Sequence, residues 1–228
     1  MKQQIILLNQ KDKSKKIFPE ELRKIFAQSE LMGEAFFNYS NGKPKQDLSP
    51  VIMTKQGRVG FVLQGQEGLD IFTNELSNLS CFLEQSDLFT GFEVQTNNLT
   101  GVYSEKPFRY SVKSFVLCCS LSEEKAFKNL KKCEQVDFLK VKIERDIKRY
   151  ATRWGIDLAD EDLNIFVFED SFTDSNYSYT VHNSSQDGYK KTIMMIRNMQ
   201  FVANLKIGGF WSLGRFSSAG NGRLWYER

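Results

Sequence analysis

The order of strand and helix patterns in the first half of the chain is the feature that most restricts how it can fold. The apolar run within residues 3–8 predicts a strand, and Pro19 opens a helix that carries Glu20 and Glu21 in its first turn. Proline suits this position because its missing N–H has no helical partner there, and the helix dipole favours early acidic residues. The chain is therefore expected to begin with a strand followed by a helix.

A hairpin and a second helix follow. Residues 51–53 and 59–63 are short apolar runs on either side of Gly57, which is typical of two strands joined by a tight turn. Residues 69–79 predict a helix, and residues 92–102 can supply a closing strand. The resulting order, β-α-β-β-α-β, is that of a ferredoxin-like domain.

The pattern then starts again with a strand at residues 110–118 and a helix from residue 122 to about residue 154, ended by Gly155. Apolar residues recur in this helix at steps of three or four, which predicts one continuous buried face. They are Val136, Leu139, Ile143, Ile147, Tyr150 and Trp154.

Three further strands are expected at residues 163–169, 177–182 and 192–204. We therefore predict an α+β fold of two tandem ferredoxin-like (RRM-like) βαββαβ domains with a C-terminal glycine-rich loop. The predicted domains are residues 1–105 and 106–228. The repeat is one of element order, because the two halves share no sequence repeat.

Composition restricts the possible partners. With 31 basic and 28 acidic residues the net charge is only +3, so affinity for an anion must come from local clusters of Lys and Arg. The four cysteines show no paired ligand spacing, and we expect no metal site, no cofactor and no disulfide framework. No apolar run approaches the roughly 18 to 20 residues of a membrane helix, so a cytoplasmic protein without membrane contact is expected.

Residues 208–222 are the main functional landmark, with five glycines in fifteen positions. Such a backbone can take positive φ angles, approach a ligand closely and present free N–H groups to a phosphate, while Arg215 and Arg223 add charge. A glycine-rich hairpin without a ligand is the equally weighted alternative. No Lys-Ser or Lys-Thr follows the last glycine and no helix follows the segment, which excludes a P-loop and a dinucleotide fingerprint.

Residues 213–224, Leu-Gly-Arg-Phe-Ser-Ser-Ala-Gly-Asn-Gly-Arg-Leu, resemble the C-terminal G-rich loop of the RAMP superfamily, the RNA-binding proteins of CRISPR systems. They are most similar to the CRISPR repeat-processing endoribonucleases, and Asn204 and residues 49–68 fit the same pattern. The resemblance implies two ferredoxin-like domains and a CRISPR repeat or precursor guide RNA as partner. Other CRISPR effector subunits are further candidate partners.

RNA-binding residues are expected in the glycine-rich segment and on the basic face of the helix before it. An ordinary solvated helix surface, with Glu144 and Lys148 paired, is the alternative for the second group. The candidates are Gly208, Gly209, Gly214, Arg215, Ser217, Ser218, Gly220, Asn221, Gly222, Arg223, Lys148 and Arg149. Nearby aromatic residues are candidates either for base stacking or for the core, namely Phe108, Tyr110, Phe210, Trp211 and Phe216.

Catalytic candidates are fewer, because residues 33–45 contain no histidine where the family commonly has one. Tyr39 with Lys43 and Lys45 can supply a hydroxyl and positive charge, and His182 is the single histidine of the chain. The alternatives are that Tyr39 packs, that the lysines are solvated or contact phosphate, and that His182 is structural.

The resemblance implies an endoribonuclease that cuts precursor guide RNA within its repeats, without a metal ion, leaving a 2′,3′-cyclic phosphate. The missing histidine keeps a non-catalytic RNA-binding subunit of a guide-RNA complex as the alternative. A glycine-loop enzyme that acts on a free nucleotide is a third hypothesis.

Overall fold

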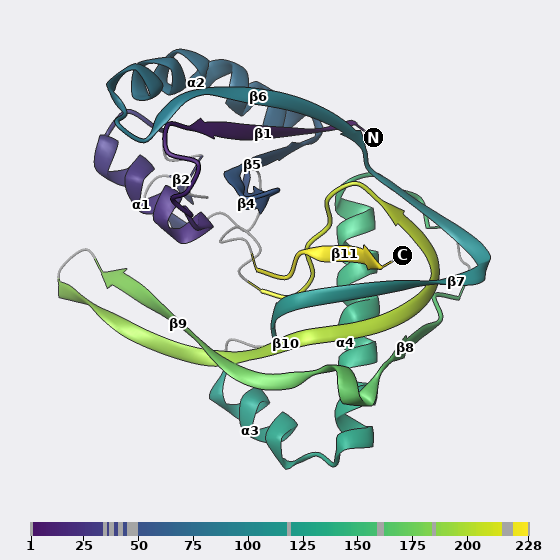
Figure 1. Cartoon of the computed structure of the whole chain (residues 1–228). Helices are drawn as coiled ribbons and strands as arrows, with labels where there is room; N and C mark the ends of the chain where they lie inside the picture. The colour runs from purple at the N-terminus through teal and green to yellow at the C-terminus, as the bar shows by residue number, and fades with distance from the viewer. Residues whose placement is uncertain are drawn as a thin grey trace. The chain divides into compact units, whose positions relative to one another are not determined.

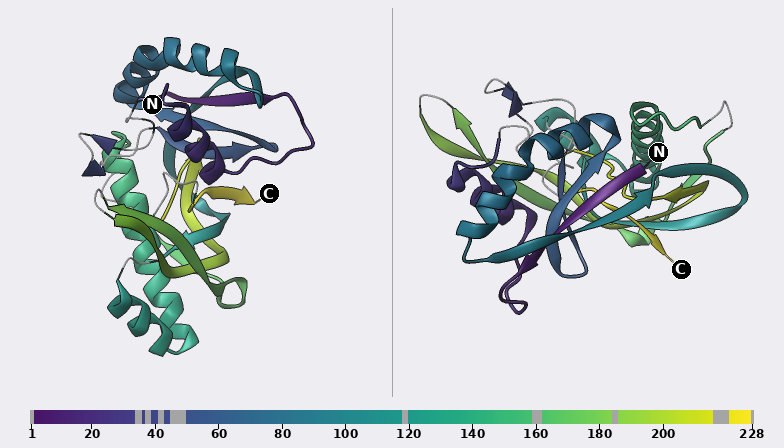
Figure 2. Two further views of the ribbon diagram at one scale, coloured as in Figure 1. Left: turned by 90° about the vertical axis from the view of Figure 1, so that its left-hand side faces the viewer. Right: turned by 90° about the horizontal axis from the view of Figure 1, so that it is seen from above.

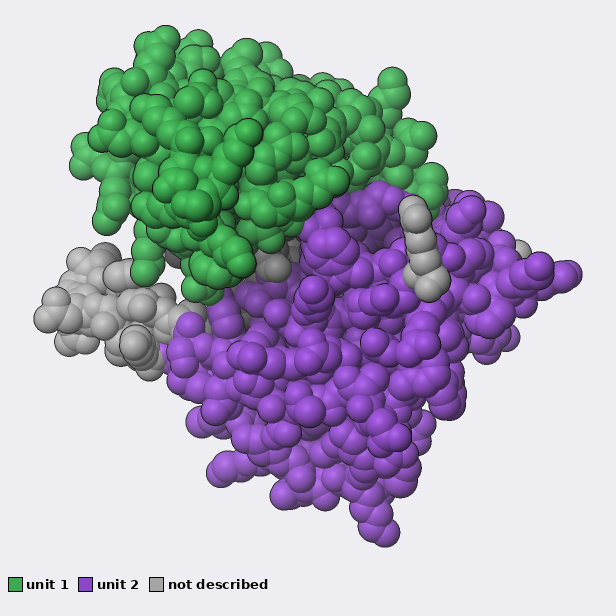
Figure 3. Space-filling model, viewed as in Figure 1, with its two compact units in different colours: residues 1–100, 217–220 green, residues 101–216, 221–228 purple. Residues whose placement is uncertain are grey.

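The computed structural model describes residues 2–33, 36, 39–40, 43–44, 50–117, 120–158, 162–183, 186–215 and 221–227, with the side chains of 39–40, 43–44, 179–183 and 186–190 left out. The chain divides into two compact units, one holding the residues up to Thr100 and the other beginning at Gly101 (Figure 3). The domain boundary expected after residue 105 stays a prediction.

Unit 1 has a single four-stranded antiparallel sheet in the order β4-β5-β1-β6. Its elements are β1 (Lys2–Gln10), α1 (Pro19–Ser29), β4 (Val51–Lys55), β5 (Arg58–Gln64), α2 (Gly65–Gln85) and β6 (Phe89–Asn98). Two short strands, β2 (Tyr39–Ser40) and β3 (Lys43–Pro44), pair with each other. The strand order is that of a ferredoxin-like domain, so the fold predicted for the first half is confirmed.

Two element boundaries in unit 1 differ from the prediction. Helix α2 begins directly after β5, at Gly65 with φ of 67°, and therefore extends further in both directions than residues 69–79. The closing strand predicted at residues 92–102 spans the end of β6 and the start of the next strand, with Leu99 between them. The more exposed and less exposed residues alternate without interruption from Gln95 to Tyr103, across that junction.

Phenylalanine rings form the centre of the unit 1 core. Phe26 from α1 meets the ring of Phe82 from α2 edge to face at 5.0 Å, and Phe36 meets Phe61 of β5 at 5.1 Å. All four side chains are buried, and both helices contact the sheet. Edge-to-face pairs add to the energy of burial, so this cluster fixes both helices on the sheet.

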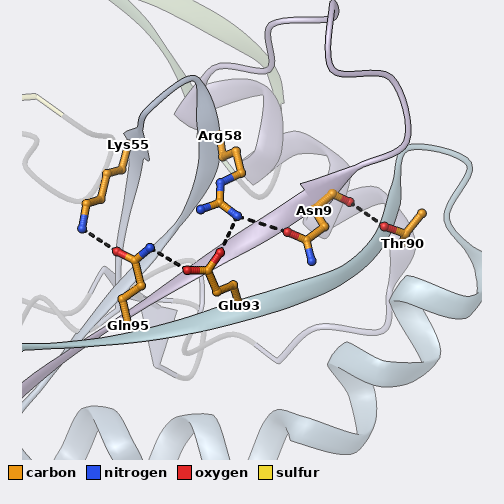
Figure 4. Close-up of polar contacts among 6 residues, drawn as sticks. All are labelled: Asn9, Lys55, Arg58, Thr90, Glu93 and Gln95. Carbon is orange, nitrogen blue, oxygen red and sulfur yellow. Dashed lines mark hydrogen bonds and ion pairs between the residues drawn. The ribbon is translucent and has the colours of Figure 1, made fainter.

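A polar network joins all four strands of the unit 1 sheet (Figure 4). The Arg58 guanidinium donates to Asn9 Oδ1 at 3.2 Å and to Glu93 Oε2 at 2.7 Å, while Lys55 Nζ donates to Gln95 Oε1 at 2.5 Å. The hydrogen bond from Gln95, and then the one from Arg58, hold the pKa of the Glu93 carboxyl below its usual value. These cross-strand contacts fix the register of the sheet.

Unit 2 repeats the strand order of unit 1. Its elements are β7 (Thr100–Val116), α3 (Leu121–Asn129), α4 (Lys132–Arg153), β8 (Ile165–Val167), β9 (Thr173–Asn183), β10 (Gln186–Gly208) and β11 (Leu224–Glu227). The sheet has the order β11-β7-β10-β8, and Figure 1 shows α4 crossing behind β7 and β10. The connection from β10 to β11 is the glycine-rich segment, whose described residues contain no helix, whereas unit 1 has α2 at the equivalent place.

Strand β10 pairs with two partners in turn. It forms a long hairpin with β9 as far as Arg197, and from Phe201 onward it pairs with β8 (Figure 2). Asn198, with φ of 57°, lies between the two pairings. Asparagine tolerates this left-handed conformation better than most residues, so the sequence allows the strand to change direction here.

The single helix predicted from residue 122 to about residue 154 is two helices. The Ser120 hydroxyl caps α3 by accepting from the Glu123 N–H at 3.2 Å, and Leu130 ends it in an extended conformation. The buried face predicted from the apolar stripe lies on α4, and Gly155, with φ of 61°, follows its end as expected. The break was missed because no glycine or proline marks it.

None of the helices in the described ranges combines the length and the apolar character that crossing a membrane requires.

We expect Gly60→Ala to lower the free energy of unfolding by about 1–3 kcal/mol, the range for overpacking. A Cβ at Gly60 would overlap the Ile6 carbonyl oxygen of the neighbouring strand. Gly57→Asn in the hairpin turn is the matched control, since φ is 78° there, which asparagine tolerates, and no atom lies near its Cβ position. Urea denaturation measures both, and equal stability of the two variants would contradict the packing argument.

Candidate functional site

The glycine-rich segment forms a hairpin-like stem between β10 and β11. The Leu213 N–H donates to the Gly222 carbonyl at 2.8 Å, and the Leu224 N–H donates to the Trp211 carbonyl at 2.9 Å. Gly222 has φ of 73°, and a Cβ there would overlap the Leu213 carbonyl oxygen. Glycine is therefore required at this position by both conformation and space.

The stem is also bonded to β7. The Arg215 N–H donates to the Val116 carbonyl at 3.0 Å, and the Gly222 N–H donates to the Ser114 carbonyl at 2.6 Å. The expectation that these amides are free to bind phosphate is therefore wrong for Arg215 and Gly222. Backbone donors in a packed stem need partners, and the neighbouring strand supplies them.

A buried carboxylate on α4 holds the turn of the segment. Asp146 is 4% exposed, and its Oδ2 accepts from the Gly214 N–H at 2.7 Å. Its Oδ1 lies 3.2 Å from Arg149 Nη2, whose side chain is 56% exposed. The Gly214 amide is thus bonded as well, and Asp146 connects the segment to a rigid helix.

Aromatic packing adds a second connection to α4. The Trp211 ring is fully buried and stacks on Tyr150 at 4.7 Å, with 24° between the ring planes. The Tyr150 hydroxyl donates to the Phe210 carbonyl at 2.9 Å, and Trp211 Nε1 donates to the Gly208 carbonyl at 3.0 Å. Of the two roles expected for Phe210 and Trp211, the structure shows the core role.

Tyr110 of β7 also belongs to the core. Its hydroxyl donates to the Leu205 carbonyl and accepts from the Ile207 N–H, both at 2.8 Å. Burial raises the pKa of this phenol to about 12. The side chain therefore remains neutral and fixes the end of β10 just before the glycine-rich segment begins.

The two arginines of the segment have different surroundings. Arg215 is exposed, whereas the Arg223 guanidinium lies 3.6 Å from the centre of the Trp225 ring and 5.2 Å from that of Phe210. Burial lowers the pKa of Arg223 to about 10, which still leaves it protonated at neutral pH. Arg215 is therefore the accessible cation, and Arg223 is a stacked one.

On α4, Lys148 Nζ lies 2.8 Å from Glu144 Oε1. This is the pair expected if the basic face of the helix is an ordinary solvated surface. The hydrogen bond to Glu144 raises the pKa of Lys148. An exposed pair of this kind contributes little to stability, so Lys148 can exchange Glu144 for a phosphate.

Two buried polar side-chain atoms of the stem have no hydrogen-bond partner among the described residues. Asn221 is 8% exposed with its Nδ2 unpaired, and Ser212 is 7% exposed with its Oγ unpaired. Buried polar groups are almost always bonded, so each needs an explanation, and a bound ligand is one. Asn221 was a candidate from the sequence, whereas Ser212 was not.

Several candidates remain untested. Ser217, Ser218, Gly220, Phe216 and Lys45 lie outside the described residues. The backbones of Tyr39 and Lys43 lie in the β2–β3 pair and that of His182 lies in β9, but their side chains are outside the described part of the chain. The assignment of a catalytic role to any of them stays a prediction.

Sequence reasoning missed Asp146 and the hydroxyl of Tyr150 as anchors of the segment. The available signal was an acidic residue at a position of the apolar face of α4, next to Ile147, with Tyr150 one turn later on the same face. Nothing in the local sequence shows that the partner of Asp146 lies 68 residues further along the chain.

Comparison with known proteins gives consistent results. The family model described as type IV CRISPR-associated endonuclease Csf5 matches residues 1–228. A solved structure of Csf5, a CRISPR-Cas type IV Cas6 crRNA endonuclease, is similar with a TM-score of 0.70 and 17% identity over 100% of this chain and 99% of that one. Cas6b, a CRISPR RNA processing endoribonuclease, is similar with a TM-score of 0.60 and 15% identity over 100% of both chains. No curated protein sequence matches.

We expect Asp146→Ala to lower the free energy of unfolding by about 1–3 kcal/mol, because the buried Gly214 N–H loses its acceptor. Hydrogen exchange at the Gly214 amide should accelerate at the same time. Asp137→Ala, an exposed acidic residue on the same helix, is the control and should change neither quantity. Unchanged exchange at Gly214 in Asp146→Ala would show that the carboxylate does not hold the segment.

Proposed function

The chain belongs to the Csf5 family of type IV CRISPR-associated endonucleases, and from this premise we propose that it binds the repeat of precursor guide RNA and cuts it without a metal ion. The resemblance inferred from residues 213–224 is thereby confirmed at the level of the family. The proposed products are a 2′,3′-cyclic phosphate on one fragment and a 5′-hydroxyl on the other. A cytoplasmic location is the corresponding expectation.

The observation that carries the RNA-binding part is the buried Asn221 Nδ2 of the glycine-rich segment, which has no hydrogen-bond partner among the described residues. A phosphate oxygen of an RNA strand would accept from this donor and remove the cost of burying it. Exposed Arg215 in the same segment, and Arg149 on the helix that holds it, supply positive charge for the strand. Such charge-assisted bonds are the usual means of positioning a nucleic-acid backbone.

The proposed cleavage is a transesterification. The 2′-hydroxyl loses its proton to a general base and attacks the adjacent phosphorus, the bond to the 5′-oxygen breaks, and a general acid protonates that oxygen. Tyr39, Lys43, Lys45 and His182 are the proposed sources of the acid, the base and part of the positive charge. Because the nucleophile is part of the substrate, a metal-activated water is not needed.

The alternative is a non-catalytic RNA-binding subunit that works with other CRISPR effector subunits. Residues 33–45 contain no histidine, and this observation favours the alternative. It uses the same glycine-rich segment and the same cations, so binding alone does not distinguish the two.

We expect purified protein to cut labelled repeat RNA at one position in the presence of EDTA. A 2′-deoxy substitution at the nucleotide before the cut should abolish cleavage without weakening binding, because it removes only the nucleophile. A cyclic phosphate protects the 3′ end from periodate. The end should become sensitive only after acid has opened the ring and phosphatase has then removed the phosphate. Tight binding of the repeat with no cleavage would support the non-catalytic subunit instead.

If the proposed catalytic groups are correct, Tyr39→Phe, Lys43→Ala, Lys45→Ala or His182→Ala should lower kcat by about 10²–10⁴-fold, the range for losing a general acid or base. The dissociation constant for repeat RNA should change much less. Lys13→Ala, an exposed lysine of unit 1, is the control. If all four variants cut at the wild-type rate, other residues catalyse the reaction.

Asn221→Ala should separate binding from stability. Its Nδ2 donates no hydrogen bond to the part of the chain that the structure describes, so we expect the melting temperature to stay the same or rise. The affinity for repeat RNA should fall by about 10- to 100-fold, equivalent to losing one hydrogen bond to a charged group. A lower melting temperature with unchanged affinity would show that Asn221 is structural.

A further inference from the structure

One face of the unit 2 sheet is covered by α4, and the other face carries exposed aromatic residues. In the pairing of β10 with β8, Phe201 lies opposite Val167, and Val202 lies opposite Phe166. The first pair is fully buried, whereas Phe166 is 60% exposed. Because successive side chains of a strand point to opposite faces, Val202 and Phe166 lie on the face away from α4.

Contacts along this open face connect three strands. Arg109 Nη2 of β7 donates to Gln200 Oε1 of β10 at 2.5 Å, and its guanidinium lies 4.9 Å from the centre of the Phe168 ring. Phe168 meets Phe166 edge to face at 5.5 Å. The exposed ring of Phe166 is therefore held by a second ring, which is itself held by an arginine.

A hollow of about 200 Å³ lies beside Phe166. Val202 and Ala203 of β10 are among its lining residues, together with Phe166 from β8 and Pro107 from β7. A planar ring that enters the hollow would lie over β10, between Phe166 of β8 and Pro107 of β7, the strands that flank β10. Such a ring can stack on Phe166 at the usual centroid distance of about 4.5–7 Å.

Two asparagine side chains complete the hollow. Asn204 Oδ1 accepts from the Asn164 N–H at 2.8 Å, and Asn204 Nδ2 donates to the Asp162 carbonyl at 2.9 Å, which fixes the orientation of this amide. Asn164 Nδ2 also contacts the Asp162 carbonyl, at 3.3 Å. An amide has two N–H donors and an oxygen with two lone pairs, so both groups keep donors and acceptors for a ligand.

The chemistry of the hollow restricts its occupant. Its described lining contains an aromatic ring, aliphatic side chains and two neutral amides, and no ionised side chain. A phosphate or a metal ion would find no charged partner there. A flat, neutral heterocycle with donors and acceptors on its edge fits both the stacking surface and the amides, and nucleobases have this chemistry.

We propose that this hollow binds one unpaired nucleobase of an RNA strand, stacked on Phe166 and bonded at its edge by Asn164 or Asn204. The inference rests on the proposed function for its substrate class, RNA. A base within a duplex cannot enter, because its faces and its edge are already occupied. The hollow would therefore select a single-stranded part of the substrate, separately from the glycine-rich segment.

The test measures binding of a short single-stranded RNA of mixed sequence by fluorescence anisotropy. Phe166→Ala should raise the dissociation constant about tenfold, as expected for the loss of one base–aromatic stack, and Phe166→Tyr should keep wild-type affinity. Val141→Ala on α4 is the matched control, because Val141 is 62% exposed and lies outside the hollow. Affinity for duplex RNA of the same length should be unchanged in all variants.

A photo-crosslink between 5-bromouridine RNA and the peptide containing residues 164–168 would independently support the inference. Equal affinity of Phe166→Ala and wild type for single-stranded RNA would overturn it, and so would an equal loss in Val141→Ala. If the wild-type protein cuts repeat RNA but Phe166→Ala binds single strands with normal affinity, the hollow is not a base-binding site and the proposed function is retained. If Phe166→Ala loses affinity for single strands while the wild-type protein does not cut repeat RNA, the hollow is retained as a base-binding site and the proposed nuclease activity is rejected.

Discussion

The bond from the Gly214 N–H to the buried carboxylate of Asp146 determines where the functional segment of unit 2 lies. A carboxylate that is 4% exposed needs donors, and it obtains one from the backbone of the segment and one from Arg149. Breaking such an arrangement leaves a buried charge without partners, which is strongly destabilising. The segment is therefore held on α4, and the exposed Arg215 follows directly after the bonded Gly214 amide.

The two units show the same sheet with different connections. In unit 1, α2 follows the third strand of the sheet and covers it, whereas in unit 2 the glycine-rich segment follows the equivalent strand, β10. Trp211 of that segment stacks on Tyr150 of α4 and is fully buried. Residues of a loop thus take over part of the packing that a helix provides in the other unit.

Much of the fold could be predicted from the sequence, since apolar runs, turn glycines and Pro19 mark the strands and helices of unit 1 locally. The break between α3 and α4 could not, because Leu130 is neither glycine nor proline. For the candidate site, the roles of the residues stay predictions. Arg215 and Asn221 follow from the resemblance, but the bonded state of the amides depends on β7 and on Asp146, which are remote in sequence. Local patterns contain no information about such partners.

The packing of Trp211 beneath the glycine-rich segment has a consequence for how this protein can diverge. One short stretch of chain provides core residues, Phe210 and Trp211, and residues that we propose bind RNA, Arg215 and Asn221. A substitution in this stretch that changes RNA binding is therefore also expected to change the stability of unit 2.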